Sequence, residues 1–193
     1  MNSREGKDPE EYYTEGLSYS VKGNFKKAIE LYSRAIDLKP NFPEPYFGRG
    51  LAHLITGNYE KAIKDFTKAI EIDPSYAKAY NSRGIARAIM GNFAEAIKDY
   101  SKAIEIDPLF SEAYYNRGIS LANSGKTEEA IKNLETAIKL KPNYAAAMAN
   151  LGIIYYSKGK KQKAKEWLEK ALEIRDLLTE EILREAEKLL ENL

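Results

Sequence analysis

Residues 81–108 read NSRGIARAIMGNFAEAIKDYSKAIEIDP, and this stretch decides the fold of the 193-residue chain. Apolar side chains recur with helical periodicity in residues 77–90 and again in residues 94–106. At about 1.5 Å per residue, each helix would be roughly 20 Å long. The stretch therefore predicts two consecutive helices of similar length.

The residues around these helices predict where each one ends. Gly91 and Asn92 tolerate the left-handed backbone conformation that commonly ends a helix. Pro108 cannot continue the second helix because it has no amide proton, and it disfavours helical geometry in Asp107. The stretch is therefore expected to form an antiparallel helical hairpin. Gly84 lies inside the first helix, where glycine lowers helix stability by about 1 kcal/mol relative to alanine. Its presence there requires a separate explanation.

The same stretch recurs along the chain with a period of 34 residues. Four small-residue positions keep this period in five copies, and a proline closes four of them: Gly16, Gly50, Gly84, Gly118 and Gly152; Gly23, Gly57, Gly91, Gly125 and Gly159; Ala28, Ala62, Ala96, Ala130 and Ala164; Ala35, Ala69, Ala103, Ala137 and Ala171; Pro40, Pro74, Pro108 and Pro142. Periods of roughly 20–50 residues are typical of repeat proteins. Because one hairpin cannot bury both of its faces, we expect five hairpins to stack around one continuous core.

Small residues inside the hairpins are expected to mark close contacts between helices. Gly84, Ala96 and Ala103 lie where two helices must approach too closely for a larger side chain. Large residues such as Tyr80 and Tyr100 would fill the gaps beside them. On this interpretation Gly84 is kept for packing.

The spacing of these residues resembles that of the tetratricopeptide repeat family. In the third copy the resemblance is carried by Tyr80, Gly84, Ala96, Tyr100, Ala103 and Pro108. It implies an all-α fold, a right-handed superhelical solenoid of antiparallel helix pairs, in a single domain over residues 9–178. The implied repeats are residues 9–42, 43–76, 77–110, 111–144 and 145–178. Met148 and Asp176 depart from the pattern in the last repeat, so its second helix is free to continue into the tail.

The two ends of the chain differ from the repeats. Residues 1–8 are expected to form a polar N-terminal tail, and residues 179–193 a C-terminal capping helix. One apolar stripe on that helix is formed by Leu178, Ile182, Ala186, Leu189 and Leu193. Such a stripe either covers the open end of the fifth repeat or pairs with a second chain.

Composition excludes several classes of function. Thirty Lys and Arg residues against 29 acidic residues give a net charge of +1, so no strong field attracts nucleic acid or an anionic membrane. The absence of cysteine removes disulfides and cysteine-ligated metals. No apolar run approaches the roughly 18 residues of a membrane span. We expect a cytoplasmic protein without nucleic-acid or membrane partners.

Catalytic and metal-binding patterns are missing from the sequence. His53 is the single histidine, and neither cysteine nor a carboxylate at ligand spacing accompanies it, so no zinc site is expected. No phosphate-binding loop of the Walker type and no Gly-x-Ser-x-Gly motif occurs. We therefore expect a protein that is not an enzyme and holds no metal or cofactor.

Arginine precedes the repeated glycine in the three central repeats, and a polar residue follows each arginine sixteen positions later. The pairs are Arg49 with Asp65, Arg83 with Asp99, and Arg117 with Asn133. They are interpreted either as bridges inside each hairpin or as a row of charges for an acidic ligand, with the bridges favoured.

The resemblance also implies a binding surface, because the first helices of such repeats line the concave groove of the solenoid. The groove-facing positions are Tyr13, Leu17 and Val21 in the first repeat; Phe47, Leu51 and Ile55 in the second; Asn81, Ile85 and Ile89 in the third; Tyr115, Asn116, Ile119 and Asn123 in the fourth; and Asn150, Ile153, Tyr156 and Ser157 in the fifth. The aliphatic members also fit contacts between adjacent first helices. Aromatic and amide side chains beside an apolar row are typical of peptide-binding surfaces.

The sequence therefore predicts a non-catalytic protein-interaction scaffold that binds a peptide segment in its groove, as a monomer or a weak homo-oligomer. The alternative is a self-assembling scaffold that recruits other proteins. The subtype that clamps the acidic C-terminus of chaperones is disfavoured, because only Lys78 matches the residues of that clamp. RNA recognition is disfavoured by the neutral charge.

Overall fold

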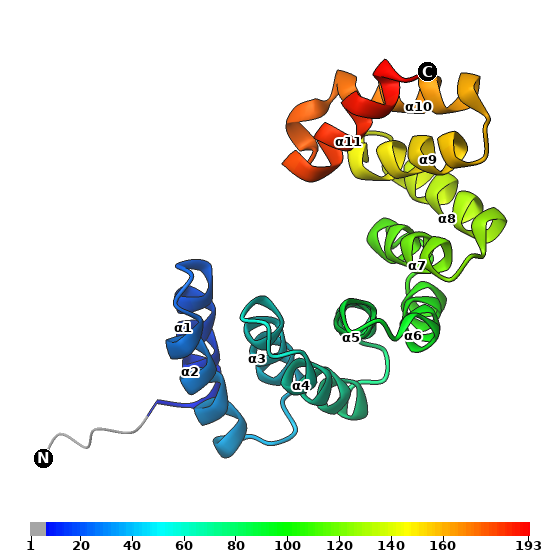
Figure 1. Ribbon diagram of the computed structural model, residues 1–193. Helices are drawn as coiled ribbons and strands as arrows, with labels where there is room; N and C mark the ends of the chain where they lie inside the picture. Colours follow the sequence, from blue (N-terminus) through cyan, green and yellow to red (C-terminus); the bar gives the residue numbers. More distant parts are fainter. Residues whose placement is uncertain (1–6) are drawn as a thin grey trace, which may run out of the picture. The chain divides into compact units, whose positions relative to one another are not determined.

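The computed structural model describes residues 7–193, which form two compact units that meet in sequence at Ile106 and Asp107. Every regular element in residues 7–193 is a helix, which confirms the predicted all-α class (Figure 1). Unit 1 contains α1 (Pro9–Val21), α2 (Phe25–Leu38), α3 (Pro43–Ile55), α4 (Tyr59–Ile72), α5 (Ala77–Ile89) and α6 (Phe93–Ile106). Unit 2 contains α7 (Ser111–Asn123), α8 (Thr127–Leu140), α9 (Ala145–Ser157), α10 (Lys161–Glu173), the 3-10 turn η1 (Arg175–Leu177) and α11 (Glu180–Glu191). Most of the tail expected over residues 1–8 lies outside the described residues.

Consecutive helices pack in the predicted antiparallel pairs, α1 with α2, α3 with α4 and α5 with α6 in unit 1, and α7 with α8 and α9 with α10 in unit 2. The turn inside each pair is made by glycine. Gly91 has a φ of +80°, in the left-handed region that other residues adopt only at a cost of roughly 1–2 kcal/mol. The amide of Asn92 then donates to the carbonyl of Arg87 (2.9 Å) and closes the end of α5. The predicted role of Gly91 is confirmed.

Gly84 is kept because of a close contact, as the sequence predicts, but the partner is a ring and not a second backbone. A Cβ atom at Gly84 would lie 2.6 Å from Cε1 of Tyr100, far inside contact distance. Tyr100 is 1% exposed and fills the centre of the hairpin. The equivalent Gly16 and Gly50 meet the rings of Tyr32 and Phe66. Each first helix of unit 1 therefore has a notch that seats an aromatic side chain from the second helix.

The central arginines form the predicted bridges inside their hairpins. Arg83 donates to both carboxylate oxygens of Asp99, through Nε (3.0 Å) and Nη2 (2.7 Å). Arg49 makes the same two bonds to Asp65. Each arginine also donates to a hydroxyl of the preceding repeat, Arg49 to Ser33 on α2 and Arg83 to Thr67 on α4. One guanidinium group thus joins three helices, a link that the sixteen-residue spacing did not predict.

The fourth repeat carries a weaker version of this bridge. Arg117 donates through Nε to the amide oxygen of Asn133 at 2.8 Å. For Arg49, burial alone would lower the pKa of the guanidinium group. The hydrogen bond and the charge of Asp65 outweigh burial, so the pKa of Arg49 is raised. The pKa of Arg117 is lowered by burial, because Asn133 contributes no negative charge.

Replacing Asn133 by aspartate is therefore expected to stabilise unit 2. A carboxylate in this position would convert a neutral acceptor into a charged one, at the loss of the hydrogen bond from Asn133 Nδ2 to the Glu129 carbonyl (2.8 Å). The charged bond is the stronger of the two, so we expect a net gain of about 1 kcal/mol in the unfolding free energy. Urea denaturation followed by the fluorescence of Trp167, the single tryptophan, reports on unit 2 directly. Asp65→Asn in unit 1 is the reverse change and should lower stability. A neutral or destabilising effect of Asn133→Asp would contradict this account of the bridge.

The C-terminal helix packs within its own chain. The second helix of the fifth repeat does not continue into the tail: α10 ends at Glu173, η1 follows, and Thr179 accepts a hydrogen bond from the amide of Ile182 to start α11. Ala186 is completely buried, and Leu178 and Ile182 pack on a cluster formed by Met148, Ala149 and Ala171 from α9 and α10. The apolar stripe of α11 thus lies on the last helix pair.

Candidate functional site

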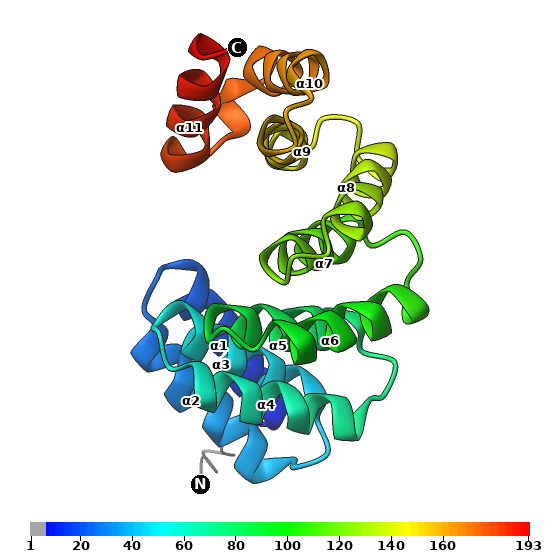
Figure 2. The same cartoon turned by 45° about the vertical axis from the view of Figure 1, so that its right-hand side comes forward.

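The first helices of unit 1 lie side by side. Helix α1 contacts α3, and α3 contacts α5, while α2, α4 and α6 each pack against the first helix of their own pair (Figure 2). Residues four apart on a helix share a face, and residues 34 apart hold equivalent places in neighbouring repeats. We define the first-helix face of unit 1 by Leu17, Val21, Leu51, Ile55, Ile85 and Ile89.

This face exposes apolar side chains where each first helix ends. Val21, Ile55 and Ile89 hold the same place in three consecutive repeats and are 89%, 61% and 53% exposed. Leu17 is 40% exposed, and Leu51 and Ile85 are half-buried. Isolated exposed hydrophobic residues are ordinary, but here three exposed apolar side chains hold equivalent positions on adjacent helices and form a row, as is typical of interaction surfaces.

The predicted aromatic and amide residues of unit 1 contribute less to this exposed face. Tyr13 packs against Phe42 with ring centroids 5.5 Å apart, and Phe47 packs against Tyr76 at 4.9 Å. Phe42 and Tyr76 immediately precede α3 and α5, so both contacts lie at the joints, the segments that lead from one repeat into the next. Asn81 is only 7% exposed. The six predicted residues of unit 1 lie on α1, α3 and α5: Tyr13, Leu17, Phe47, Leu51, Asn81 and Ile85. The rings of Tyr13 and Phe47 pack at the joints between repeats.

Unit 2 presents a more polar first-helix side. Asn123 and Ser157 occupy the places of Val21, Ile55 and Ile89. The predicted residues Ile119, Ile153 and Tyr156 lie on this side, where Ile119 and Tyr156 pack, partly buried, against the cluster around Leu134 and Leu151, together with Tyr115. Asn116 is half-buried on α7. The amide nitrogen of Asn150 donates to the carbonyl of Ala146 at 2.8 Å and lies 3.4 Å from the Tyr115 hydroxyl.

Tyrosines at the joints are held neutral. Burial raises the pKa of Tyr76 far above its usual range, and the charges of Tyr13, Glu44 and Asp73 raise it further. Burial also raises the pKa of Tyr144, with smaller contributions from Tyr115 and Glu112. These hydroxyls remain protonated at neutral pH, so the joints present uncharged rings beside carboxylates.

Groups suited to binding a metal ion do not converge in the described part of the chain. No group of three or more potential metal-binding side chains occurs within residues 7–193. His53 lies half-buried on α3, and burial lowers its pKa. Among the helices of residues 7–193, none is long and apolar enough to cross a membrane.

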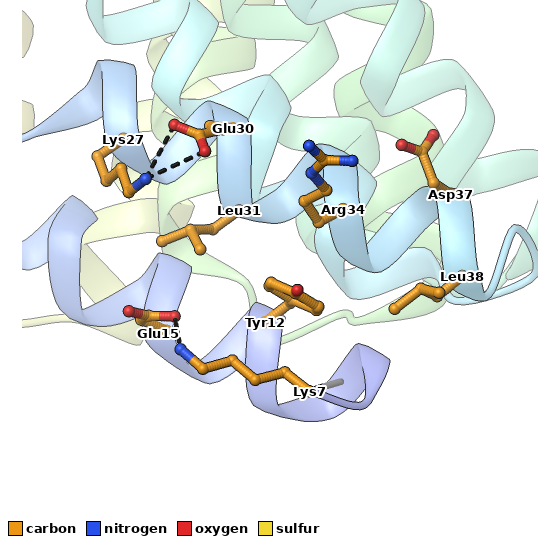
Figure 3. A pocket seen from close by; sticks show the side chains of 9 residues that line it. All are labelled: Lys7, Tyr12, Glu15, Lys27, Glu30, Leu31, Arg34, Asp37 and Leu38. Carbon is orange, nitrogen blue, oxygen red and sulfur yellow. Dashed lines mark hydrogen bonds and ion pairs between the residues drawn. The ribbon is translucent and has the colours of Figure 1, made fainter. Parts of the chain in front are cut away.

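A pocket of about 530 Å³ lies between α1 and α2, on the side of α1 that faces away from Leu17 and Val21. Tyr12 and Glu15 line it from α1, and Leu31, Arg34 and Leu38 line it from α2 (Figure 3). Lys7 closes one edge by an ion pair with Glu15 at 2.5 Å. The pocket mixes apolar and charged groups.

Comparison with known proteins agrees with this architecture. Sequence profiles described as tetratricopeptide repeat match residues 43–76, 77–110 and 109–176, and a profile described as TPR repeat matches residues 16–57. These matches together span residues 16–176 without a gap. No curated protein matches the chain.

Solved structures with similar folds include MamA, which is 28% identical over 83% of this chain and 94% of its own, with a TM-score of 0.77. YrrB, described as a TPR protein with an unusual peptide-binding site, is 24% identical over 94% of this chain and 92% of its own, with a TM-score of 0.73. TTC0263, a thermophilic TPR protein of Thermus thermophilus, is 21% identical over 94% of this chain and 98% of its own, with a TM-score of 0.73. At these identities the last two show similarity of fold alone. With five helix pairs in the predicted period, the chain belongs to the tetratricopeptide repeat family, whose fold is a protein-interaction scaffold.

Proposed function

We propose that the protein is a non-catalytic scaffold that binds an apolar peptide segment on the first-helix face of unit 1. The observation that carries this proposal is the exposed row of Val21, Ile55 and Ile89. Fixed helices present this row, so only the ligand loses conformational freedom on binding. The description of YrrB as a peptide-binding TPR protein supports the same use of the fold.

Peptides selected on the protein from a random library are expected to bind this row. Ile55→Asn and Ile89→Asn copy Asn123, the residue that unit 2 has in the equivalent place. Each removes one apolar anchor and should weaken a selected peptide about tenfold, as the loss of roughly 1.5 kcal/mol of burial predicts. Fluorescence anisotropy of the labelled peptide measures the affinity.

The matched control is Leu177→Asn, because Leu177 is 63% exposed but lies in η1, away from the face. It should leave the affinity unchanged. Circular dichroism establishes that each variant is folded. Equal affinity of wild type and both isoleucine variants would rule out the first-helix face of unit 1 as the binding surface.

We propose self-assembly as a second function, on the strength of the pocket between α1 and α2. In the next repeat, Tyr46 and Arg49 take the places of Tyr12 and Glu15, and both contact the second helix of the preceding repeat, through Ile36 and Ser33. The pocket thus shares Tyr12 and Glu15 with the surface on which a preceding helix would dock (Figure 3). The equivalent pocket of the second repeat, lined by Tyr46 and Arg49, stays open beside the docked α2. A helix from another copy would fit the same surface.

Light scattering over a range of protein concentrations tests this second function. Self-assembly predicts an average mass that rises with concentration and a Leu38→Glu variant that stays monomeric, because Leu38 is 55% exposed at the edge of the pocket. A monomeric wild type at every concentration would exclude it.

A further inference from the structure

Two joints between consecutive repeats contain a lysine held between a carboxylate and an aromatic ring. At the first joint, Lys39 Nζ lies 2.5 Å from Glu10 Oε1 and 4.8 Å from the ring centroid of Phe42. In unit 2, Lys141 Nζ lies 3.5 Å from Glu112 Oε1 and 4.6 Å from the ring centroid of Tyr144. A cation near both a carboxylate and a ring face is favoured by its attraction to each.

The joint between the second and third repeats has the same carboxylate and ring but no lysine. Glu44 stands where the other joints have Glu10 and Glu112, and Tyr76 where they have Phe42 and Tyr144. Position 73, which corresponds to Lys39 and Lys141, is an aspartate. Among these three of the four joints, this middle one therefore differs mainly by the loss of the internal cation.

The aromatic geometry of this middle joint matches that of unit 2. The rings of Phe47 and Tyr76 lie 4.9 Å apart at 38°, and the rings of Tyr115 and Tyr144 have the same separation and angle. The ring of Tyr76 is therefore placed in the same way as the ring of Tyr144, over which Lys141 lies in unit 2. What the middle joint lacks is charge compensation.

Glu44 has no compensating partner within residues 7–193. Neither of its carboxylate oxygens forms a hydrogen bond or ion pair with these residues, and Oε2 is buried. Glu112, by contrast, accepts from Ser111 at 3.0 Å and pairs with Lys141. Asp73 adds a second carboxylate, whose Oδ1 accepts from the amide and hydroxyl of Ser75. A buried carboxylate oxygen without a partner is costly. The charges of Glu44 and Asp73 both act on the Tyr76 hydroxyl, so a cation beside that ring would be attracted by both.

We propose that Glu44, Asp73 and Tyr76 bind the cationic side chain, lysine or arginine, of the polypeptide that docks on unit 1. This inference rests on the proposed function, which it deepens by naming the chemistry of the ligand. The ligand ammonium or guanidinium group takes the place that Lys39 and Lys141 occupy in the other joints. The apolar row of Val21, Ile55 and Ile89 lies on the same first helices and receives apolar residues of the same ligand.

Titration with n-butylammonium chloride, the free analogue of a lysine side chain, tests the site without any peptide. NMR spectra of the folded full chain should show saturable shifts of the Glu44 carboxyl and Tyr76 ring signals, and n-butanol should not produce them. Glu112 should respond weakly, since Lys141 already occupies its site. Two results would overturn the proposal. One is a shift of the Glu44 signal no larger than that of the exposed Glu60. The other is a Tyr76 shift that persists in the Glu44→Gln variant.

Two substitutions, each of which gives one joint the character of the other, provide a sharper test. Asp73→Lys supplies the missing internal lysine and is expected to abolish the butylammonium response at Tyr76. Lys141→Met empties the joint in unit 2 and is expected to create a response at Tyr144. Circular dichroism identifies any variant that fails to fold. If folded Asp73→Lys keeps the wild-type response and folded Lys141→Met gains none, the comparison between joints is wrong.

A library-selected peptide separates this inference from the proposed function. Replacing its lysine or arginine by norleucine should weaken binding about tenfold to the wild type and scarcely at all to Glu44→Gln, as expected for a charged hydrogen bond with a cation–ring contact. Affinity that depends on Ile55 but is equal for wild type and Glu44→Gln would overturn the cation site alone. A butylammonium response in a protein that binds no peptide would overturn the proposed function alone.

Discussion

Replacing Asp99 by alanine is expected to lower the free energy of unfolding by about 3 kcal/mol, because removal of one partner from a buried ion pair leaves the other charge uncompensated. Asp99 is 3% exposed and accepts hydrogen bonds from Arg83 Nε and Nη2 and from Arg87 Nη1 (2.7 Å). Its loss leaves two guanidinium groups near the hairpin core. Their side chains are 13% and 25% exposed, so water compensates them only in part.

Asp65→Ala is the matched control for this prediction. Asp65 is similarly buried but pairs with one arginine, Arg49, whose side chain is 21% exposed. We expect it to cost less than Asp99→Ala. Urea denaturation followed by circular dichroism measures both, and a double-mutant cycle on Arg83 and Asp99 isolates their coupling. A loss below about 1 kcal/mol for Asp99→Ala would place this bridge with ordinary surface pairs.

Replacing Gly84 by alanine is expected to destabilise unit 1 by about 2 kcal/mol, although alanine is the better helix former by about 1 kcal/mol. The added Cβ would lie 2.6 Å from Cε1 and 2.9 Å from Cδ1 of Tyr100. That ring is buried and cannot swing into solvent, so either the helices separate or the ring leaves its preferred rotamer. Both outcomes reduce stability.

Gly118→Ala tests the same notch against a smaller partner. Its nearest atom is Cγ of Leu134 at 3.1 Å, and an aliphatic side chain adjusts more easily than a ring. We expect a smaller loss than at Gly84. The double substitution Gly84→Ala with Tyr100→Leu places in the third repeat the leucine of the fourth and should recover part of the stability lost by Gly84→Ala. Equal losses at Gly84 and Gly118 in urea denaturation would show that ring packing does not set the cost.

The candidate site was only partly predictable. The period placed Leu17, Val21, Ile55 and Ile89 on the first helices, but it carried no information on how far each is buried. The sequence also shows that Asp73 stands where Lys39 and Lys141 stand in other repeats. Only the tertiary structure shows why this difference matters, because it places Lys141 over the ring of Tyr144 and beside Glu112. A charge pattern identifies a site only when the distances between its members are known.

The sequence by itself determined the elements and their pairing, because these depend on local physical chemistry. Helical periodicity, a left-handed glycine such as Gly91 and a closing proline such as Pro108 each act within a few residues, so a 34-residue period fixes a hairpin in every copy. Tertiary structure alone decided which side chains fill the spaces between hairpins. Tyr100 entering the notch at Gly84, Arg83 reaching Thr67 in the preceding repeat, and Glu44 remaining without a cation all depend on distances between residues far apart in the chain.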